Sequence, residues 1–268
     1  ENAEDSQRHS KATESRFSVH QPENEQVEEP EEENELHKIH MLQSLQALQY
    51  MKKVPLPHID QIRDKMVFLP PPKNKNATKT LIFDMDETLI HWVDDIDEEN
   101  PQVVLDVVFE DGEVVEACIN VRPFAIDCLK AANELFQVIV FTASHKCYAD
   151  VVLDHIDPTG ELIQYRLYRD SWYKTEDNVY IKDLRIIQNR ELCDLVIVDN
   201  AVYSFGFQLD NGIPIIPYYD DPNDEELYHL IPYLDILAEG DDVRVKNREA
   251  FQLREMAKEN TEDLEYFE

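Results

Sequence analysis

Residues 81–92 constrain the fold more than any other part of this sequence. Three apolar residues, Leu81-Ile82-Phe83, run directly into two aspartates one residue apart, Asp84 and Asp86. An uninterrupted apolar run of this kind predicts a strand buried on both faces of a parallel sheet. The two carboxylates then stand at the carboxyl end of the strand, where open α/β sheets bind ligands. One such acid can attack and hold a metal ion while the other moves a proton.

Acidic residues are so common in this chain that a pair of aspartates is weak evidence alone. Asp and Glu supply 57 of the 268 residues, and a second Asp-x-Asp pair, Asp95 and Asp97, follows shortly afterwards. That second pair has no apolar run before it and no threonine after it, so we interpret it as a solvated loop. The first pair ends an apolar run and is followed by Thr88, which can cap the turn. This context favours a catalytic role for Asp84 and Asp86.

Negative charge is concentrated in the middle of the chain. The whole sequence has a formal net charge of −32, and residues 76–240 contain 34 acidic against 10 basic residues. A field of this sign repels nucleic acids and anionic membrane surfaces. We therefore expect no direct binding to DNA or RNA.

Cysteine usage and the length of the apolar runs indicate the cellular environment. The four cysteines show no Cys-x-x-Cys spacing, which is typical of reduced, intracellular thiols rather than of a disulfide framework. No apolar run approaches the length that crosses a membrane, and no secretory signal is visible. We expect a soluble, monomeric, intracellular protein of the nucleus or cytoplasm. The cysteines are Cys118, Cys128, Cys147 and Cys193.

Composition separates the two ends of the chain from its middle. Residues 1–35 are rich in polar residues and poor in apolar ones, which predicts a disordered acidic tail. Residues 36–75 predict a helix, over 36–53, and a proline-rich linker. The apolar stripe of this helix recurs every third residue and winds around it; we expect it to pack on the domain, with docking of a partner as the alternative. Residues 241–268 predict a charged C-terminal helical extension.

Strands and helices alternate between residues 76 and 240. A hairpin is predicted over 103–121, because apolar residues alternate on both sides of Asp111-Gly112. The alternation predicts a three-layer, Rossmann-like α/β fold with a central, mostly parallel sheet. The hairpin is then a small insert and not a large cap. We expect one helix that opens at Pro123, with Phe124 pointing inward, and a second helix over 145–156. A third helix should be capped by Asp224 and kinked by Pro232. The further expected strands are 137–142, 192–199 and 212–217.

Polar residues stand at the ends of three of these strands. Asp84 and Asp86 follow the first, Thr142 ends the second, and Asp199-Asn200 end the third. In a parallel sheet all three ends open on the same edge. Carboxylate and amide oxygens suit Mg²⁺, and a hydroxyl suits an anion. A cation to hold phosphate is missing from these positions, and we expect it between residues 146 and 190, which contain seven of the ten basic residues of the domain.

Five motifs follow one another along the chain: Phe83-Asp84-Met85-Asp86-Glu87-Thr88-Leu89, Arg122-Pro123, Phe141-Thr142-Ala143-Ser144, Tyr180-Ile181-Lys182-Asp183-Leu184 and Val198-Asp199-Asn200. In this order they resemble the FCP/SCP phosphatases. This haloacid dehalogenase-like family dephosphorylates the RNA polymerase II C-terminal domain and related phosphoproteins, and the resemblance covers about residues 79–240. Two further segments, Gln208-Leu209-x-Asn211-Gly212-Ile213-Pro214 and Asp242-Val243-Arg244, look closest to the small-phosphatase-like branch.

The resemblance implies a haloacid dehalogenase-like fold and a Mg²⁺-dependent protein serine/threonine phosphatase. Asp84 would be the nucleophile that forms an aspartyl-phosphate, and it would also bind Mg²⁺. Asp86 would protonate the leaving serine oxygen and then activate water, and its backbone carbonyl would bind the metal together with Asn200. Thr142 and Lys182 would bind oxygens of the phosphate, and Arg169 would contact the phosphate or the substrate. Asp199 and Thr88 would support the metal ligands without binding the metal themselves.

Two positions depart from the family pattern and concern the substrate. Where the family has an aromatic residue that helps form a pocket for a substrate proline, this chain has Asp94, with Trp92 two residues before it. A leucine three residues after the strand threonine is replaced by His145. These departures favour a phosphoprotein substrate in general over the polymerase C-terminal domain in particular.

Other functions remain as alternatives to the phosphatase. A catalytically weak module could hold phosphoproteins in the same cleft, although the intact Asp84, Asp86 and Lys182 argue against it. Haloacid dehalogenase activity is disfavoured, because that chemistry needs neither Asp86 nor a metal. A hairpin insert leaves the site open, which fits a protein substrate better than a small metabolite.

Overall fold

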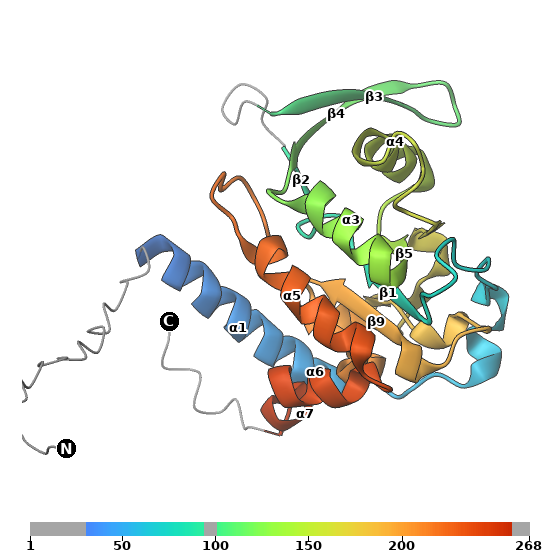
Figure 1. Cartoon of the computed structure of the whole chain (residues 1–268), viewed down its shortest axis with the longest axis vertical. Coiled ribbons are helices and arrows are strands. Elements are labelled where there is room, and N and C mark those ends of the chain that lie inside the picture. The colour runs from blue at the N-terminus through green and yellow to red at the C-terminus, as the bar shows by residue number, and fades with distance from the viewer. Residues whose placement is uncertain (1–30, 94–100, 259–268) are drawn as a thin grey trace, which may run out of the picture.

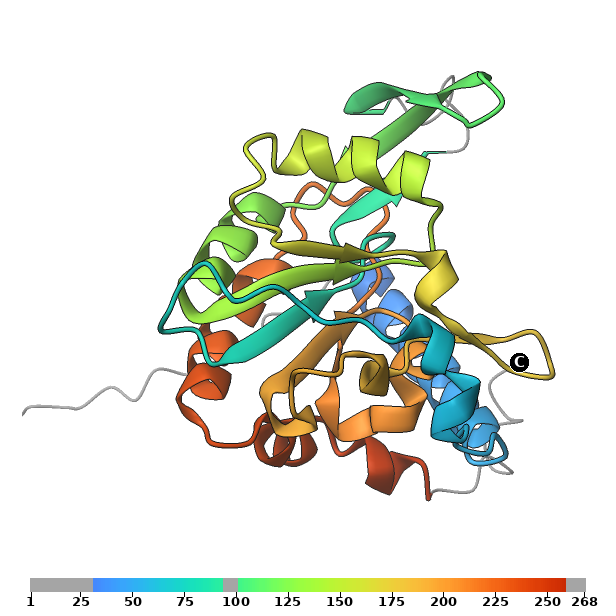
Figure 2. The same cartoon turned by 90° about the vertical axis from the view of Figure 1, so that its right-hand side faces the viewer.

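Within the described residues, the central sheet has five strands in the order β10-β9-β1-β5-β6, and every neighbouring pair is parallel. The computed structural model describes residues 31–93 and 101–258, the coloured parts of Figures 1 and 2. The predicted α/β fold with a parallel central sheet is confirmed. The strands are β1 (Lys79–Phe83), β5 (Phe136–Phe141), β6 (Tyr165–Leu167), β9 (Leu195–Asp199) and β10 (Gly212–Pro214).

β1 lies in the middle of the sheet because it is apolar on both faces. Every residue of the strand is buried, and it pairs with β5 on one side and β9 on the other. Successive side chains of a strand point to opposite faces. Leu81 and Phe83 accordingly belong to one hydrophobic core, and Ile82 belongs to the other. A core on each face of the sheet gives the three layers.

Helices cover both faces of the sheet. On the face of Leu81, the core is completed by α3, α4 and α5, and Figure 1 shows α3 and α5 side by side. On the face of Ile82, α1 packs on the long 3-10 helix η6. The bounds are α1 (Glu31–Met51), α3 (Ala125–Leu135), α4 (Lys146–Ile156), η6 (Val202–Asn211) and α5 (Glu226–Glu239).

The predicted hairpin forms a small antiparallel sheet outside the central one. Its strands β2 (Ile90–Trp92), β3 (Val103–Val108) and β4 (Val114–Val121) follow the order β2-β4-β3. Gly112 turns the chain between β3 and β4 with a φ of +88°, a value that favours glycine. Figure 2 shows the hairpin projecting past α4, which β3 contacts. Residues 94–100, with Asp94, Asp95 and Asp97, lie outside the described residues.

Several predicted boundaries are wrong for local reasons. The helix that we expected to open at Pro123 begins at Ala125, because Phe124 adopts a left-handed φ of 60°; its side chain is 39% exposed and not inward. The strand expected over 192–199 starts with a 3-10 turn and becomes β9 only at Leu195. The strand expected over 212–217 ends as β10 at Pro214.

The cap of α5 also differs from its prediction. The helix begins at Glu226, and Glu225 takes the N-cap position without a side-chain cap bond. Asp224, one residue earlier, still accepts from the Glu226 N–H over 3.2 Å, and it also accepts two hydrogen bonds from the wholly buried Arg122, of 2.8 and 2.7 Å. Arg122 also donates to the backbone carbonyl of Thr88 over 3.3 Å. The guanidinium therefore ties the start of α5 to the turn that follows β1.

α1 begins at Glu31, five residues before the expected start at 36, and ends at Met51, two residues before the expected end at 53. Its residues Leu45, Leu48 and Met51 are buried. The Met51 side chain comes within 2.5 Å of the position that a Cβ of residue 206 would take, so a larger residue in place of Gly206 would displace Met51. α1 thus packs on the domain. Residues 1–30, most of the expected acidic tail, lie outside the described residues.

The chain between α1 and β1 follows a defined path along the domain. Two short 3-10 helices, Ile59–Gln61 and Arg63–Lys65, come first. Val67 then pairs with Ile187, and buried Leu69 exchanges hydrogen bonds with the Asn189 side chain.

The C-terminal extension, which we expected to be helical over 241–268, contains two short helices. α6 (Val243–Phe251) and α7 (Leu253–Met256) are separated by Gln252, whose φ of 49° breaks the helical path. Residues 259–268 lie outside the described residues. Across the described ranges, no helix is long and apolar enough to cross a membrane.

Candidate active site

Asp84 and Asp86 lie in a tight turn directly after β1. The backbone N–H of Asp84 still donates to the Val198 carbonyl over 2.9 Å, so this aspartate extends the pairing of β1 with β9. Glu87 has a φ of 54°, and the N–H of Leu89 returns to the Met85 carbonyl over 2.8 Å. The turn leads into β2 and leaves both carboxylates at the carboxyl edge of the sheet, as predicted.

Lys182, which lies between residues 146 and 190, brings a cation to the edge of the sheet. Its Nζ donates to Asp84 over 2.5 Å and to Asp199 over 2.6 Å. A small hairpin, β7 (Tyr173–Lys174) and β8 (Tyr180–Ile181), delivers it to this place. Burial opposes its charge, but the carboxylates of Asp199 and Asp84 outweigh burial and raise the pKa of Lys182. Lys182 is therefore a fixed, buried positive charge.

Asp199 accepts a hydrogen bond from Lys182 and is itself held by two other donors. Its Oδ1 accepts from the Ala201 N–H over 2.8 Å, and its Oδ2 accepts from the Ser204 hydroxyl over 2.5 Å. The Ser204 carbonyl in turn accepts from the backbone N–H of Lys182 over 2.6 Å. Ser204 escaped sequence reasoning, because no motif or strand end marks it.

Asp86 has a different environment from Asp84, made of hydroxyl groups. The Ser144 hydroxyl donates to it over 2.8 Å, Thr142 over 3.3 Å and Tyr148 over 3.4 Å. Burial raises the pKa of Asp86, while these hydrogen bonds act in the opposite direction. Thr142 thus contacts this acid at the end of β5. Ser144 and Tyr148 were not predicted as site residues, although Ser144 belongs to a quoted motif.

The other predicted residues lie around these two acids. Arg169 is exposed at the rim, where its Nε donates to the Ala143 carbonyl over 2.7 Å and its Nη1 lies 3.1 Å from His145 Nε2. Asn200 lies at the end of β9, and its backbone carbonyl accepts from His40 of α1 over 2.8 Å. Thr88 is wholly buried below the turn, and its hydroxyl has no hydrogen-bond partner among the described atoms.

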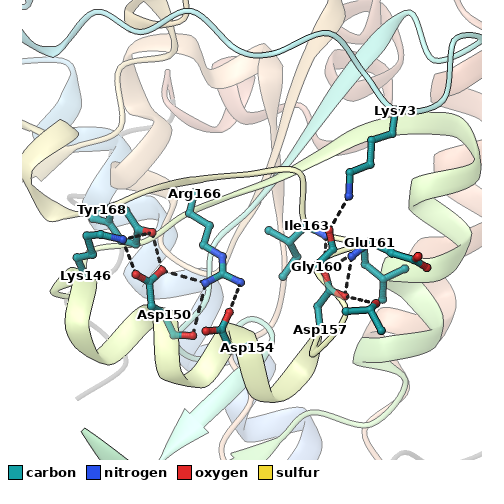
Figure 3. Close-up of polar contacts among 12 residues, drawn as sticks. Lys73, Lys146, Asp150, Asp154, Asp157, Gly160, Glu161, Ile163, Arg166 and Tyr168 are labelled. Carbon is teal, nitrogen blue, oxygen red and sulfur yellow. Dashed lines mark hydrogen bonds and ion pairs between the residues drawn. The ribbon is translucent and has the colours of Figure 1, made fainter. Parts of the chain in front are cut away.

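Two other basic residues of this region are engaged away from the site. Figure 3 shows Arg166 paired with Asp150 and Asp154, at 2.9 and 2.8 Å, and Lys146 paired with Asp150. Tyr168 donates a further hydrogen bond to Asp150 over 2.6 Å. These contacts connect α4 to β6. Lys146 and Arg166 are therefore structural cations.

The residues at the sheet edge fit a divalent cation. Asp84 and Asp199 bring two buried carboxylates to the buried ammonium group of Lys182, and the carboxylate of half-buried Asp86 belongs to the same turn as Asp84. Burial raises the pKa of Asp84 well above its usual value; Lys182 counteracts this, whereas Asp199 and Asp86 add to it. The donors that Asp84, Asp86 and Asn200 offer are the hard oxygens that Mg²⁺ prefers. No group of three or more His, Cys, Asp or Glu side chains suited to a metal occurs in residues 31–93 and 101–258.

Residues 79–244 match the family model described as NLI interacting factor-like phosphatase. The chain belongs to this family. The match confirms the resemblance to the FCP/SCP phosphatases, and it contains both aspartates of the turn after β1 as well as Lys182, Asp199 and Asn200. It does not include α1, although His40 of that helix contacts Asn200.

Relatives of this NLI interacting factor-like protein carry phosphatase names. "CTD small phosphatase-like protein 2" of Dictyostelium discoideum is 41% identical over 190 residues, which cover 71% of this chain and 33% of that protein. "CTD small phosphatase-like protein 3" of Caenorhabditis elegans is 36% identical over 201 residues, 74% of this chain and 68% of that one. Human "Carboxy-terminal domain RNA polymerase II polypeptide A small phosphatase 1" is 35% identical over 176 residues, 65% and 66% of the two chains. A solved structure of Fcp1, "an essential RNA polymerase II CTD phosphatase", has a TM-score of 0.45 and 21% identity, covering 72% of this chain and 55% of that one. The chain thus spans between one third and about two thirds of the length of these three curated relatives.

Proposed function

We propose that the protein is a Mg²⁺-dependent protein serine/threonine phosphatase that works through an aspartyl-phosphate. The observation that carries the proposal is a pair of acids in unlike surroundings, Asp84 buried and Asp86 half-buried. Asp84 faces the ammonium of Lys182, and Asp86 faces three hydroxyl groups. Two carboxyl groups whose environments differ in this way suit two different roles, nucleophile and proton carrier. The phosphatase names of the relatives agree with these roles.

In the first step, an oxygen of the Asp84 carboxylate attacks the phosphorus of a phosphoserine. The bond from phosphorus to the serine oxygen breaks while Asp86 gives its proton to that oxygen. The serine hydroxyl leaves, and the phosphoryl group stays on Asp84. Lys182 offsets the charge on the phosphoryl oxygens, and Mg²⁺, when bound by Asp84, Asp86 and Asn200, adds further charge neutralisation.

In the second step, Asp86, now ionised, takes a proton from a water molecule as that water attacks the phosphorus. The bond between phosphorus and Asp84 breaks, and inorganic phosphate is released. Asp86 is protonated again, and Asp84 is again a carboxylate. Asp199 keeps Lys182 in place throughout, because Ser204 and the Ala201 N–H hold its two oxygens.

The proposed substrate is a phosphoprotein. The β2–β4 insert is a hairpin beside the site, which leaves room for a polypeptide. A hollow of about 230 Å³ between the hairpin and α4 is lined by Asp86, Trp92, Val107 and His145, among others. The human relative is named for RNA polymerase II. Because His145 replaces a family leucine in this hollow, we propose a phosphoserine protein without restricting it to the polymerase.

The net charge and the cysteines indicate where the protein acts and which partners it avoids. The net charge of −32 disfavours direct binding of nucleic acid. We propose that the protein acts as a monomer inside the cell, in the nucleus or cytoplasm, since its four cysteines show no disulfide pattern.

Removal of divalent cations is expected to abolish most of the activity. An aryl phosphate should be hydrolysed with Mg²⁺ present, and EDTA should lower the rate about a hundredfold, because several kcal/mol of charge stabilisation would be lost. Excess Mg²⁺ should restore the rate. Turnover that EDTA leaves unchanged would contradict metal dependence, and absence of turnover under all conditions would favour the phosphoprotein-binding module instead.

Surface charge is expected to favour phosphoserines flanked by Lys or Arg. The excess of acid over base in residues 76–240 repels acidic, multiply phosphorylated segments at long range. Lys146 and Arg166 do not offset this field at the site, because Asp150 and Asp154 engage them. The preference should weaken with salt, since the Debye length falls from about 10 Å at 0.1 M to about 3 Å at 1 M. The measurement is kcat/KM for matched peptides with basic and acidic flanks at both salt concentrations; a preference for the acidic peptide, or one that salt leaves unchanged, would contradict it.

A further inference from the structure

A groove of about 860 Å³ lies beside the active site and outside the hairpin insert. One wall is α1, with His40, Gln43, Gln46 and Tyr50. The other walls come from the β7–β8 hairpin and from the segment after β9. Three of its lining residues, Ala143, Arg169 and Asn200, belong to the rim of the active site. The groove therefore borders the proposed phosphoserine site.

Polar contacts at the middle and at the end of α1 hold this wall in place. At the middle, His40 Nε2 lies 2.8 Å from the Asn200 carbonyl, and because a carbonyl only accepts, the nitrogen carries the proton. Toward its end, the Tyr50 hydroxyl lies 3.1 Å from the Thr175 hydroxyl of the opposite hairpin. Leu48 between them is buried on the domain. Hydrogen bonds and core packing therefore fix α1 as a wall of the groove.

The lining of the groove is unusual for so acidic a chain. Among the described residues that line it there is no Asp or Glu, and its ionisable basic side chains are His40 and Arg169. Aromatic rings and side-chain amides dominate it instead. Such rings and amides contact polypeptides well, because they offer large rigid surfaces and adaptable hydrogen bonds. The aromatic residues are Tyr50, Trp172, Tyr180, Tyr203 and Tyr219, and the amides are Gln43, Gln46, Asn178 and Asn200.

Acidic residues gather at one side of the groove. Pro217 and Tyr219 line both the groove and a second hollow of about 450 Å³. That hollow is lined by Asp220, Asp221, Asp224, Glu225 and Glu226. A polypeptide that left the groove at this side would meet carboxylates, which attract Lys and Arg.

We propose that the groove between α1 and the β7–β8 hairpin binds the substrate polypeptide on one side of the phosphoserine. Neutral residues next to the phosphoserine lie against the aromatic and amide lining, and a Lys or Arg farther along reaches the acidic residues near Tyr219. This deepens the proposed phosphatase function and rests on it. Because α1 lies outside the segment matched by the family model, this part of the binding surface belongs to the chain's own extension.

Tryptophan substitutions on α1 test the proposal. Gln43 and Gln46 are exposed and face the groove, so Gln43→Trp and Gln46→Trp should obstruct it without disturbing the core. Met41→Trp is the matched control, since Met41 is exposed on the same helix and does not line the groove. The substrates are an aryl phosphate, a short phosphoserine peptide, and that peptide extended with neutral and then basic residues on either its N-terminal or its C-terminal side.

We compare kcat/KM for each extended peptide with kcat/KM for the aryl phosphate. For one of the two extended peptides this ratio should fall about tenfold in Gln43→Trp and Gln46→Trp, which is the effect expected when a few central contacts are lost. The short peptide and the Met41→Trp protein should show no such change. An unchanged ratio for both extended peptides, or a change of equal size in Met41→Trp, would overturn the proposal.

Binding measurements separate failure of the groove from failure of the phosphatase function. Fluorescence anisotropy with the extended phosphopeptides is carried out on Asp84→Asn protein, with and without Gln46→Trp. Weaker binding in the double variant supports the groove even if no turnover is ever detected. Equal binding in the two proteins overturns the groove and leaves the phosphatase proposal intact.

Discussion

Asp84→Asn is expected to lower kcat/KM for every phosphoester by a factor on the order of 10⁴, because an amide cannot form the aspartyl-phosphate. Folding should survive, since the two side chains are nearly the same size and Lys182 keeps its 2.6 Å contact with Asp199. We expect an equal or higher Tm, because removing a buried charge removes its desolvation cost. Steady-state kinetics and thermal unfolding of the same preparations measure both effects.

The control for this experiment is Asp127→Asn. Asp127 is exposed on α3, 3.9 Å from Lys130, and the same chemical change there should leave the kinetics unaltered. Beryllium fluoride, which mimics an aspartyl-phosphate, should inhibit the wild-type protein and not the Asp84→Asn variant. Substantial activity in Asp84→Asn would rule out the nucleophile that we propose.

The positions of the two acidic strand ends and Thr142 could be predicted from sequence because they depend on short-range signals. Asp84, Thr142 and Asp199 each follow or end an apolar run, and apolar runs report buried parallel strands. The register then brings the ends together: Phe83 pairs with Val140 of β5 and with Val198 of β9. Local pattern and general sheet geometry were sufficient here.

Lys182 could be placed only within a range of basic residues by pattern alone. β8, which precedes it, is two residues long and shows no period that would fix its direction. What selects Lys182 is its burial between two carboxylates, whereas Lys146 and Arg166 have closer partners on α4. The family resemblance pointed to it, but hydrophobic patterning could not.

Contacts between distant segments escaped sequence reasoning altogether. Tyr148 is nearly buried among core residues of α4, so its helical spacing predicts a core residue although its hydroxyl reaches Asp86. His40 contacts Asn200 across 160 positions of the sequence. Both contacts depend on tertiary packing, which the local pattern does not report.

Asp86→Asn is expected to differ from Asp84→Asn, because its loss of activity should depend on the leaving group of the substrate. The asparagine keeps the backbone carbonyl and a similar shape, but it cannot give a proton to the leaving group. Serine is a poor leaving group, so kcat/KM for a phosphoserine peptide should fall by about 10³, within the range typical of general acid catalysis. An aryl phosphate leaves as a stable phenolate and needs little protonation, so its first step should be much less affected.

A burst measurement with the aryl phosphate sharpens this comparison. In Asp86→Asn the phosphoryl group should still reach Asp84, giving a burst of phenolate in proportion to the enzyme, and the later water attack should be slow because its base is missing. Asp84→Asn should show no burst, and Asp127→Asn should behave as the wild type does. Equal losses on both substrates with no burst would mean that Asp86 shapes the site and does not carry the proton. A burst with slow turnover would instead assign both proton transfers to this one carboxyl group, the acid that Ser144, Thr142 and Tyr148 surround.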